Sequence, residues 1–300
     1  MINSVAKRFE TDYPEEFRCL YMKECSESGR NALKEKRVIT SYLAGKNNGA
    51  VILSEDEGTS VLLNGEDHVR IQVLCNGMDI QSCFKKANEI DDYIDAHFDY
   101  AFDEKYGYKT TFPTNTGTGM KAGYTLHLPS LSDARRLNDI SAELGRFGLK
   151  FRTVYGDGQN GYGNLYQIST QKTLGQDERE VIKDLDDIVL QIVNQEKEQR
   201  EHFYKKDKIQ MDDEIYKSYG VLKYARKLSL KDSMVLISEL MTGVSLGVLQ
   251  FAHNGRYNIN ELIMDIQPAV LRQNSGKAMS VAETDVLRAE YIRKYLPEII

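Results

Sequence analysis

Residues 64–70 form a dense cluster of charged side chains. The run Asn-Gly-Glu-Asp-His-Val-Arg places the carboxylates of Glu66 and Asp67, the imidazole of His68 and the guanidinium of Arg70 within one turn and one strand start. Titratable groups at this density are typical of sites that move protons or bind charged ligands. Each residue alone also fits a structural role: Glu66 and Asp67 in a turn, His68 as a hydrogen-bonded neighbour, Arg70 as an outward strand residue. The case for chemistry rests on the combination.

Three cations occupy similar places in the sequence. Arg70, Lys121 and Arg152 each lie in or beside a predicted strand, next to a polar loop. Arginine and lysine side chains bind phosphate oxygens and stabilise the charge of a transferring phosphoryl group. If the three converge, they suit a polyphosphate ligand.

A glycine-rich segment at residues 156–161, GDGQNG, matches G-x-G-x-x-G letter for letter. A dinucleotide fingerprint must open a helix within a parallel βαβ unit, whereas a strand is predicted to follow this segment. We therefore interpret it as a loop between two strands, in which glycine lets backbone amides approach a ligand. The segment GTGMKAG likewise lacks P-loop spacing, since no glycine stands five residues before Gly119.

The elements that must position these residues follow from hydrophobic periodicity. Residues 50–75 predict an antiparallel meander, and a helix is predicted from about Asp79, with apolar residues at helical spacing. A second helix is predicted to open at Ser132, with Leu137, Ile140, Leu144 and Phe147 on one side, and to close at Gly148. Two short strands, LKFRTVY and GNLYQIS, flank the glycine-rich loop. The fold class is α+β, with mostly antiparallel strands and helices packed against them.

The character of the chain changes from Gln176 onward. A long helical stripe ends in the charged run NQEKEQREHFYKKDK, and the apolar residues beyond it keep helical spacing. We therefore expect two domains, a catalytic domain over residues 1–207 and a helical domain over residues 208–300.

Composition limits the function classes. The chain has 300 residues and a net charge of 39 − 45 = −6, which argues against binding to nucleic acid through its phosphates. The start, MINSVAKRFETDYPEEF, predicts neither a signal peptide nor a membrane anchor, and no window has the roughly 20 apolar residues that span a bilayer. The four cysteines, Cys19, Cys25, Cys75 and Cys83, lack zinc-site spacing. We expect free thiols in a reducing cytoplasm.

Three segments carry a resemblance to a known family. NGEDHVRIQ, FPTNTGTGMKAGYTLHLP and RTVYGDGQNGYGNLYQIS resemble, in the same order, the N-E-E-D-H-x-R, C-P-T-N-x-G-T-G-x-R-A and R-G-x-x-G-E motifs of the ATP:guanido (phosphagen) kinases. Within that family the tail segments KSYGVL, LIMDIQPAVLRQ and TDVLRAEYIR are similar to the C-terminal domain of the bacterial protein arginine kinases.

The resemblance implies ATP-dependent phosphorylation of protein arginine side chains, with ATP and Mg²⁺ as cofactors and no metal site of the protein itself. A guanidinium is a poor nucleophile, with a pKa above about 12, until carboxylates orient it and accept a proton. By motif matching that role falls on Glu66 and Asp157, which we expect to meet across a crevice lined by the cations. The resemblance also implies a nucleotide site, made by the cations Arg70, Lys121 and Arg152 and by the backbone of Ala122, Gly123, Tyr124, Thr125, Thr153, Val154, Tyr155, Gly156 and Asp157.

The sequence departs from the family pattern at the site. Lys121 stands for an arginine, Asp157 for the second glutamate, Phe112 for a cysteine and Gly65 for a non-catalytic glutamate. Tyr42 is aligned with a nucleotide-contacting histidine and could stack on adenine. Near the N-terminus VAKRFETDYP resembles only the tail of S-x-R-I-R-x-A-R, which implies that two phosphate-binding arginines are missing. A lysine is not equivalent to a forked arginine, and a carboxylate shifted by about 1 Å can cost about 10²-fold in rate.

The tail predicts a second site and several partners. The family's R-D-x-x-R-A pocket for phosphoarginine reads Thr-Asp-Val-Leu-Arg-Ala here, which leaves Asp285 and Arg288 to bind phosphoarginine; an exposed helix-face ion pair is the alternative. The resemblance implies protein substrates, a zinc-binding adaptor, an unfoldase-protease and a homodimer as partners. The alternative function is a catalytically impaired pseudokinase that binds phosphoarginine or a partner.

Overall fold

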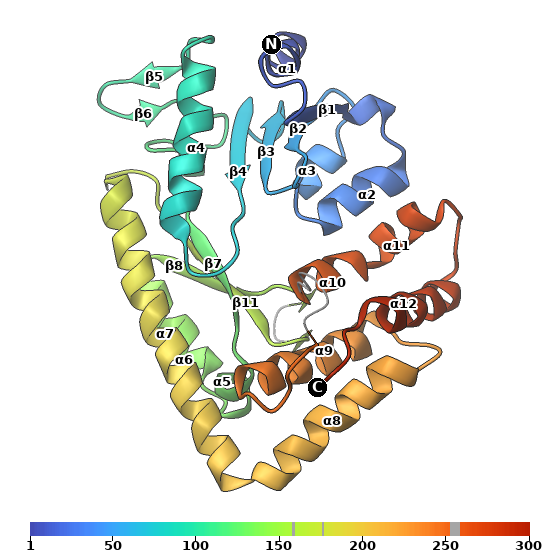
Figure 1. Ribbon diagram of the computed structural model, residues 1–300. Coiled ribbons are helices and arrows are strands. Elements are labelled where there is room, and N and C mark those ends of the chain that lie inside the picture. The colour runs from blue at the N-terminus through green and yellow to red at the C-terminus, as the bar shows by residue number, and fades with distance from the viewer. Residues whose placement is uncertain (158–159, 176, 253–258) are drawn as a thin grey trace. The chain divides into compact units, whose positions relative to one another are not determined.

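The computed structural model describes residues 1–157, 160–175, 177–252 and 259–300, with the backbone alone at residues 157 and 160. These residues form two compact units, one of Met1–Ala122 with Thr170–Asp186 and one of Gly123–Ser169 with Asp187–Ile300. Figure 1 shows the ribbon of both units. The predicted division into residues 1–207 and 208–300 stays a prediction. Each compact unit combines two separate stretches of the chain, so the units do not correspond to consecutive domains.

The first unit is built on a four-stranded antiparallel sheet in the order β1-β2-β3-β4. Its strands are β1 (Phe17–Tyr21), β2 (Ala50–Ser54), β3 (Thr59–Leu63) and β4 (Val69–Val73). The predicted meander is confirmed, with Ile52 opposite Val61 and Leu62 opposite Arg70. Because β2 and β3 are buried on both faces, each contains an uninterrupted apolar run, AVIL in β2 and VLL in β3.

Helices cover both faces of this sheet (Figure 1). On one face α1 (Ile2–Asp12) and α4 (Ile80–Asp95) contribute Phe9 and Ile94 to a core with Val61. On the other face α2 (Glu27–Glu35) and α3 (Ser41–Ala44) cover a core that contains Leu43 and Leu62. The unit also holds the 3₁₀ turns η1 (Met22–Glu24) and η2 (Pro113–Asn115), the small hairpin of β5 (Phe102–Asp103) and β6 (Gly107–Tyr108), and the start of α7 (Glu178–Lys206).

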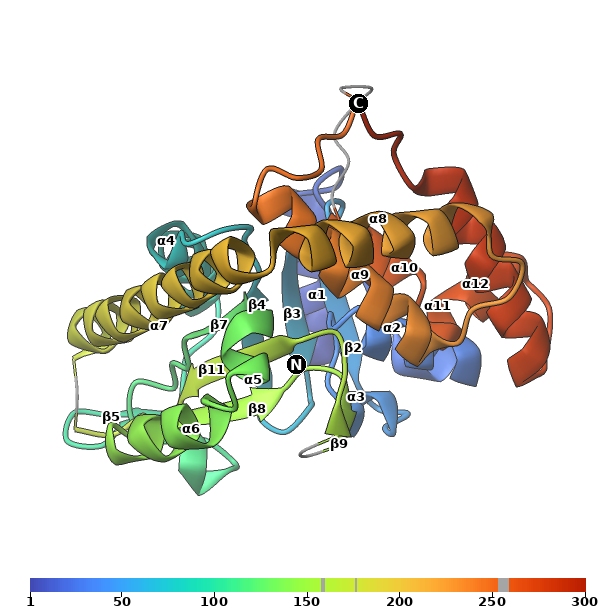
Figure 2. The ribbon, with the colours of Figure 1, turned by 90° about the horizontal axis from the view of Figure 1, so that it is seen from below.

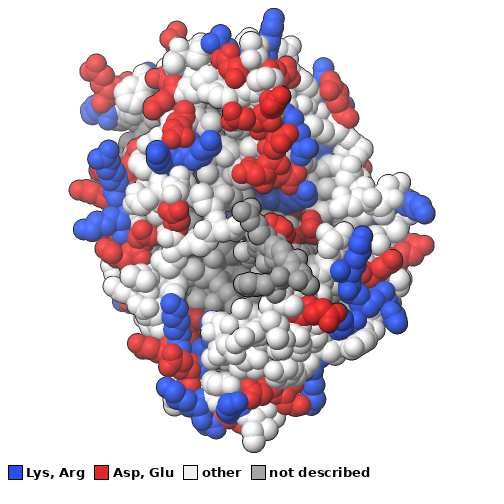
Figure 3. Space-filling model, in the orientation of Figure 1, with Lys and Arg blue, Asp and Glu red and all other residues white. Residues whose placement is uncertain are grey.

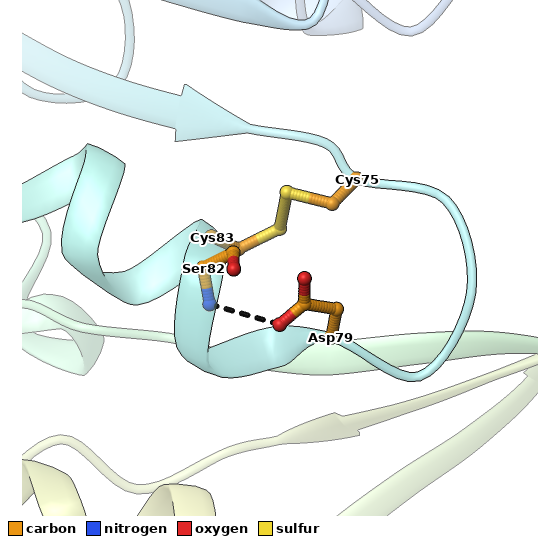
Figure 4. Close-up of a disulfide and its surroundings, with 4 residues drawn as sticks. All are labelled: Cys75, Asp79, Ser82 and Cys83. Carbon is orange, nitrogen blue, oxygen red and sulfur yellow. Dashed lines mark hydrogen bonds between the residues drawn. A yellow bond between two sulfur atoms is a disulfide. The ribbon is translucent and has the colours of Figure 1, made fainter.

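The prediction of four free thiols is wrong for two cysteines. Cys75 follows β4 and forms a disulfide with Cys83 in the first turn of α4, with Cα atoms 6.1 Å apart (Figure 4). The carboxylate of Asp79 accepts a hydrogen bond from the Ser82 N–H over 3.2 Å and so fixes the start of this helix. The connecting loop then turns back and brings the two cysteines within disulfide reach. Cys19 is free, and burial raises the pKa of its thiol to about 11.

The second unit contains a three-stranded sheet in the order β7-β11-β8 and the helices of the C-terminal region. Its strands are β7 (Gly123–His127), β8 (Leu149–Thr153) and β11 (Leu165–Thr170), together with the two-residue strands β9 (Gly156–Asp157) and β10 (Asn160–Gly161). The helices are α5 (Pro129–Asp133), α6 (Leu137–Arg146), the remainder of α7, α8 (Lys208–Tyr224), α9 (Leu230–Ser245), α10 (Ile259–Asp265), α11 (Pro268–Ser275) and α12 (Val281–Tyr295). α8 and α9 lie side by side in both views (Figures 1 and 2).

The prediction of one helix opening at Ser132 is wrong in its boundaries. The chain forms α5 and α6 instead, because Pro129 starts the first helix earlier and Arg135, at φ 56°, breaks the helical path between them. Phe147, expected on the apolar side, is 64% exposed just beyond α6. The predicted stop at Gly148 is confirmed by its φ of 72°.

Candidate functional site

Glu66 lies in the tight turn between β3 and β4. The turn is closed by the Asn64 N–H, which donates to the His68 carbonyl over 2.9 Å. The Glu66 carboxylate is half-buried and accepts a hydrogen bond from the Thr40 hydroxyl over 3.0 Å. Thr40 is also the N-cap of α3, where its hydroxyl accepts from the Leu43 N–H over 3.2 Å. One hydroxyl therefore fixes both the helix start and the orientation of the predicted catalytic carboxylate.

Asp67 connects the charged cluster to the polar loop that follows Pro113. One oxygen of its carboxylate accepts from the backbone N–H groups of Thr111 and Phe112 over 2.7 and 3.1 Å, and the other accepts from the Asn115 amide over 2.6 Å. The Asn115 oxygen in turn accepts from the Lys121 ammonium over 2.5 Å. Two motifs about 45 residues apart thus meet within the first unit. Asp67 is therefore more than a turn residue, because its carboxylate joins the two motifs.

Tyr42 and Phe112 form an exposed aromatic pair beside these carboxylates. Their ring centroids are 6.0 Å apart in an edge-on arrangement, and the side chains are 44% and 39% exposed. The Lys46 ammonium lies 4.4 Å from the Tyr42 ring centroid and donates to the Gly65 carbonyl over 3.2 Å. Tyr42 therefore presents an accessible ring near Glu66, which suits stacking on a flat ligand but does not distinguish adenine from a guanidinium.

Arg70 lies in β4 opposite Leu62. Its strand neighbours Val69 and Ile71 pack on the face covered by α1 and α4, so Arg70 belongs to the opposite face. The side chain is exposed, and it makes no hydrogen bond or ion pair with another of the described residues. Arg70 thus has the exposure that a phosphate-binding cation needs.

In the second unit a polar row crosses the three-stranded sheet. Thr125 of β7 pairs with Gln167 of β11, and the Arg152 guanidinium of β8 donates to the Gln167 oxygen over 2.8 Å through Nε and also through an Nη. The neighbours Leu126, Tyr166 and Ile168 are buried on the other face. The predicted residues Thr125 and Arg152 therefore share the exposed face of one sheet, with the Arg152 fork held by Gln167.

The backbone expected around the nucleotide is partly engaged elsewhere. Gly123, Tyr124 and Thr125 belong to the β7–β11 ladder, in which alternate residues turn their N–H groups toward the partner strand. The Val154 N–H donates to the Leu165 carbonyl over 2.9 Å. The Ala122 N–H donates to the Thr170 hydroxyl over 3.0 Å, and the Ala122 carbonyl accepts from the Thr170 N–H over 2.9 Å. The Tyr124 side chain is buried, so it cannot contact a ligand on the exposed face.

The glycine-rich segment forms a hairpin rather than a helix start. Asn160 pairs with Asp157 and Gly161 with Gly156, so the interpretation of a loop between strands is confirmed and a dinucleotide fingerprint is excluded. A Cβ at Gly161 would collide with Thr153, which explains the need for glycine there. The side chain of Asp157, the second predicted catalytic acid, lies outside the described part of the structure.

Comparison with known proteins decides the family. Residues 1–199 match the family model "ATP:guanido phosphotransferase, C-terminal catalytic domain", and residues 208–299 match "Protein-arginine kinase McsB C-terminal domain". The chain belongs to the ATP:guanido phosphotransferase family. It is 37% identical over 301 residues to the protein-arginine kinase of Bacillus subtilis, covering 98% of this chain and 82% of the relative. It is 40% identical over 281 residues to that of Bacillus mycoides, covering 94% and 79%.

Solved structures of this family share the fold. Lombricine kinase is similar at a TM-score of 0.55 and 18% identity, over 65% of this chain and 58% of that chain. The duplicated taurocyamine kinase of Schistosoma mansoni with bound transition state analog components gives a TM-score of 0.55 and 19% identity, over 65% of this chain and 28% of that chain. The predicted α+β class is therefore confirmed as the fold of a guanido phosphotransferase.

In the tail pair of this phosphotransferase, Arg288 is buried and Asp285 is partly buried. The Arg288 guanidinium, 2% exposed, bonds to the Asp285 carboxylate over 2.6 Å and to the carbonyls of Ile266 and Leu228, each over 2.9 Å. Thr284, where the family has an arginine, is buried and accepts from Arg272 over 3.3 Å. The alternative of a helix ion pair at i,i+3 is confirmed, but its exposure is wrong, because Arg288 joins α12 to the end of α10 and to the segment before α9. Phosphoarginine binding at Asp285 and Arg288 stays a prediction.

Sequence reasoning missed Thr40, Asn115 and Gln167. Thr40 carried a signal, since threonine before a short helix is typical of an N-cap. Gln167 stands on the polar side of an alternating strand, beside which a cation can be expected. Asn115 lay in a loop that was recognised as polar, but nothing in its spacing shows that it bridges Asp67 and Lys121.

Three further observations concern surface charge, metal binding and membrane spans. On the face shown in Figure 3, acidic and basic side chains are interspersed over both the upper and the lower parts of the molecule. Among the described residues, no group of three or more His, Cys, Asp and Glu side chains is arranged to hold a metal ion. No helix within the described ranges is long and apolar enough to cross a membrane.

Proposed function

We propose that this phosphotransferase moves the γ-phosphoryl group of ATP to arginine side chains of proteins. The relatives named protein-arginine kinase match nearly the whole chain, and the C-terminal family model is specific to such kinases. The observation that carries the proposal is the network that holds Glu66 through Thr40 and joins Asp67 to Lys121 through Asn115. It supplies a carboxylate for a guanidinium next to a cation for a phosphate.

The residues have distinct roles in this reaction. Glu66, with Asp157 as the second acid, orients the substrate guanidinium and accepts a proton from the attacking nitrogen. That nitrogen forms a bond to the γ-phosphorus, the bond from the γ-phosphorus to the β,γ-bridging oxygen breaks, and ADP leaves with the electron pair. Arg70, Lys121 and Arg152 stabilise the charge spread over the phosphoryl oxygens. Mg²⁺ accompanies ATP and is held by its phosphate oxygens.

An assay of the full chain tests this function. Purified protein, ATP, Mg²⁺ and an unfolded acceptor protein should give acid-labile phosphoarginine, detected by mass spectrometry under alkaline handling. Glu66→Gln keeps the shape of the side chain and should lower kcat at least about 10²-fold, since it removes a proton acceptor. Glu55→Gln, at an exposed acid in the β2–β3 turn, is the matched control and should leave kcat unchanged.

The outcomes separate the two functions that the sequence left open. Absence of phosphoarginine with every acceptor contradicts the proposal. Thermal stabilisation by ATP and Mg²⁺ without transfer would then support the alternative of a binding module. If Glu66→Gln retained full kcat while transfer occurred, the assignment of Glu66 would be wrong although the function stood.

The remaining expectations concern binding partners and cellular location. A zinc-binding adaptor, an unfoldase-protease, a homodimer and a cytoplasmic location follow from the family resemblance, and each stays a prediction. Sedimentation of the purified chain tests the dimer, and co-purification with a tagged chain tests the other two partners.

A further inference from the structure

Helix α9 contacts the last residue of β7 through a partly buried hydrogen-bond network. His127 Nε2 lies 2.8 Å from the Ser238 hydroxyl, and the Asn164 amide donates to the same hydroxyl over 3.1 Å. Ser238 is 1% exposed. Burial, with a smaller effect of the Arg200 guanidinium, lowers the pKa of His127 to about 3, so the imidazole is neutral at pH 7. One serine therefore holds the end of β7 and the residue that precedes β11.

The segments on either side of the β9–β10 hairpin also pack on α9. A Cβ at Gly163 would lie 3.0 Å from Met234 Cε and 3.3 Å from the Met234 carbonyl, so the chain passes directly over the helix backbone. Val154, Tyr155 and Tyr162 pack against the same hydrophobic core as Met234. The chain entering the hairpin and the chain leaving it thus both rest on the helical region.

α9 is itself fixed at its first turn. Ser229 caps the helix by accepting from the Asp232 N–H over 3.1 Å. Just before it, the Leu228 N–H donates to the Asp285 carbonyl over 3.1 Å and the Leu228 carbonyl accepts from Arg288 over 2.9 Å. With α8 alongside (Figures 1 and 2), α9 packs against the segments that flank the hairpin.

We infer that Ser238 is a positioning residue for phosphoryl transfer. By holding His127 and Asn164, it sets the place of the segments that carry the β9–β10 hairpin and, with it, Asp157. The helical region 208–300 thereby takes part in the reaction without supplying a group to the reacting atoms. The catalytic consequence of this inference rests on the proposed function. The structural role of Ser238, which is to hold His127 and Asn164, does not depend on that function.

Amide hydrogen exchange tests the link without any need for activity. Ser238→Ala removes the shared hydroxyl and should speed exchange about tenfold or more in peptides that contain Tyr162 to Leu165. Ser233→Ala is the matched control, since Ser233 is also a fully buried serine of α9, but among the described residues its hydroxyl bonds only to the Ser229 carbonyl, over 2.8 Å. Unchanged exchange in Ser238→Ala, or an equal rise in both variants, overturns the inference.

A double-mutant cycle tests the catalytic consequence in the full chain. We expect Ser238→Ala to lower kcat about tenfold with KM for ATP changed less than about twofold, because a small displacement of a catalytic acid reduces turnover more than binding. In an Asp157→Asn background the same change should have no further effect on kcat. An equal loss in both backgrounds shows a merely structural role and contradicts the inference. If exchange is faster in Ser238→Ala but the wild-type chain shows no kinase activity, only the proposed function is contradicted.

Discussion

The side-chain amide of Asn115 donates a hydrogen bond to the carboxylate of Asp67 over 2.6 Å. This bond ties the polar loop after Pro113 to the turn that carries Glu66. Because the oxygen of the same amide accepts from Lys121, the position of this cation, which we propose binds phosphate, depends on the turn that holds Glu66, the proposed catalytic acid.

Replacing Asn115 should weaken both ends of this bridge. Asn115→Ala leaves Lys121 and Asp67 each without one charge-assisted hydrogen bond, worth about 1.5 to 3 kcal/mol. We expect kcat/KM for ATP to fall about 10- to 100-fold. Thr114→Ala, in the same 3₁₀ turn and exposed, should leave it unchanged. A wild-type kcat/KM in Asn115→Ala would show that Lys121 does not need the bridge.

Thr40 should control the orientation of Glu66. Thr40→Val keeps the size of the side chain but removes the hydroxyl that donates to Glu66 and caps α3. We expect kcat to fall about tenfold, from the lost bond to a charged group, and stability to fall by about 1 kcal/mol, from the lost cap. Thr40→Ser keeps the hydroxyl and should behave as wild type. Equal kcat in both variants contradicts this role.

His127 should make stability depend on pH in the acid range. Its pKa is near 6.5 in the unfolded chain and about 3 in the folded one, so between these values the unfolded state binds more protons. The contribution is complete above pH 6.5 and is lost as the pH falls toward 3, at up to about 1.4 kcal/mol per pH unit. We would measure the free energy of unfolding by urea at several pH values. Between pH 3 and 6.5 this free energy should change less steeply with pH for His127→Gln than for the wild type. An equal dependence of stability on pH in the two proteins would contradict this role of His127.

Arg288 should be important for the stability of the helical region. Arg288→Met leaves the Asp285 carboxylate and the carbonyls of Ile266 and Leu228 without a donor, and we expect a loss of about 3 to 5 kcal/mol. Lys217→Met breaks the exposed pair with Asp213 on α8 and should not measurably shift the urea midpoint. Similar urea midpoints for the two variants would show that the buried bonds of Arg288 do not contribute to stability.

If the Cys75–Cys83 disulfide forms in solution, two of the four cysteines should carry free thiols before reduction. Protein purified without reductant and unfolded in urea should react with two equivalents of a maleimide, at Cys19 and Cys25, and with four after reduction. Mass spectrometry reads the difference directly. Four reactive thiols before reduction would show that the cysteines are all reduced in solution.

Local patterning made much of the fold predictable. Alternating and continuous apolar runs located β2, β3 and β4, helical spacing located α4 and α7, and motif order indicated Glu66 and Arg152 as site residues. The split between α5 and α6 was not predictable, because it depends on one residue, Arg135, in a left-handed conformation.

The sequence by itself determined the family, the class of fold and the residue types of the site, since these follow from local spacing and from motifs read in order. Only the tertiary structure decided which side chains meet. Asn115 bridging Asp67 to Lys121, Arg288 buried among carbonyls and Ser238 between His127 and Asn164 are contacts between segments remote along the chain. Hydrogen bonds require a donor and an acceptor within about 3 Å, and no sequence spacing specifies that distance for residues brought together by folding.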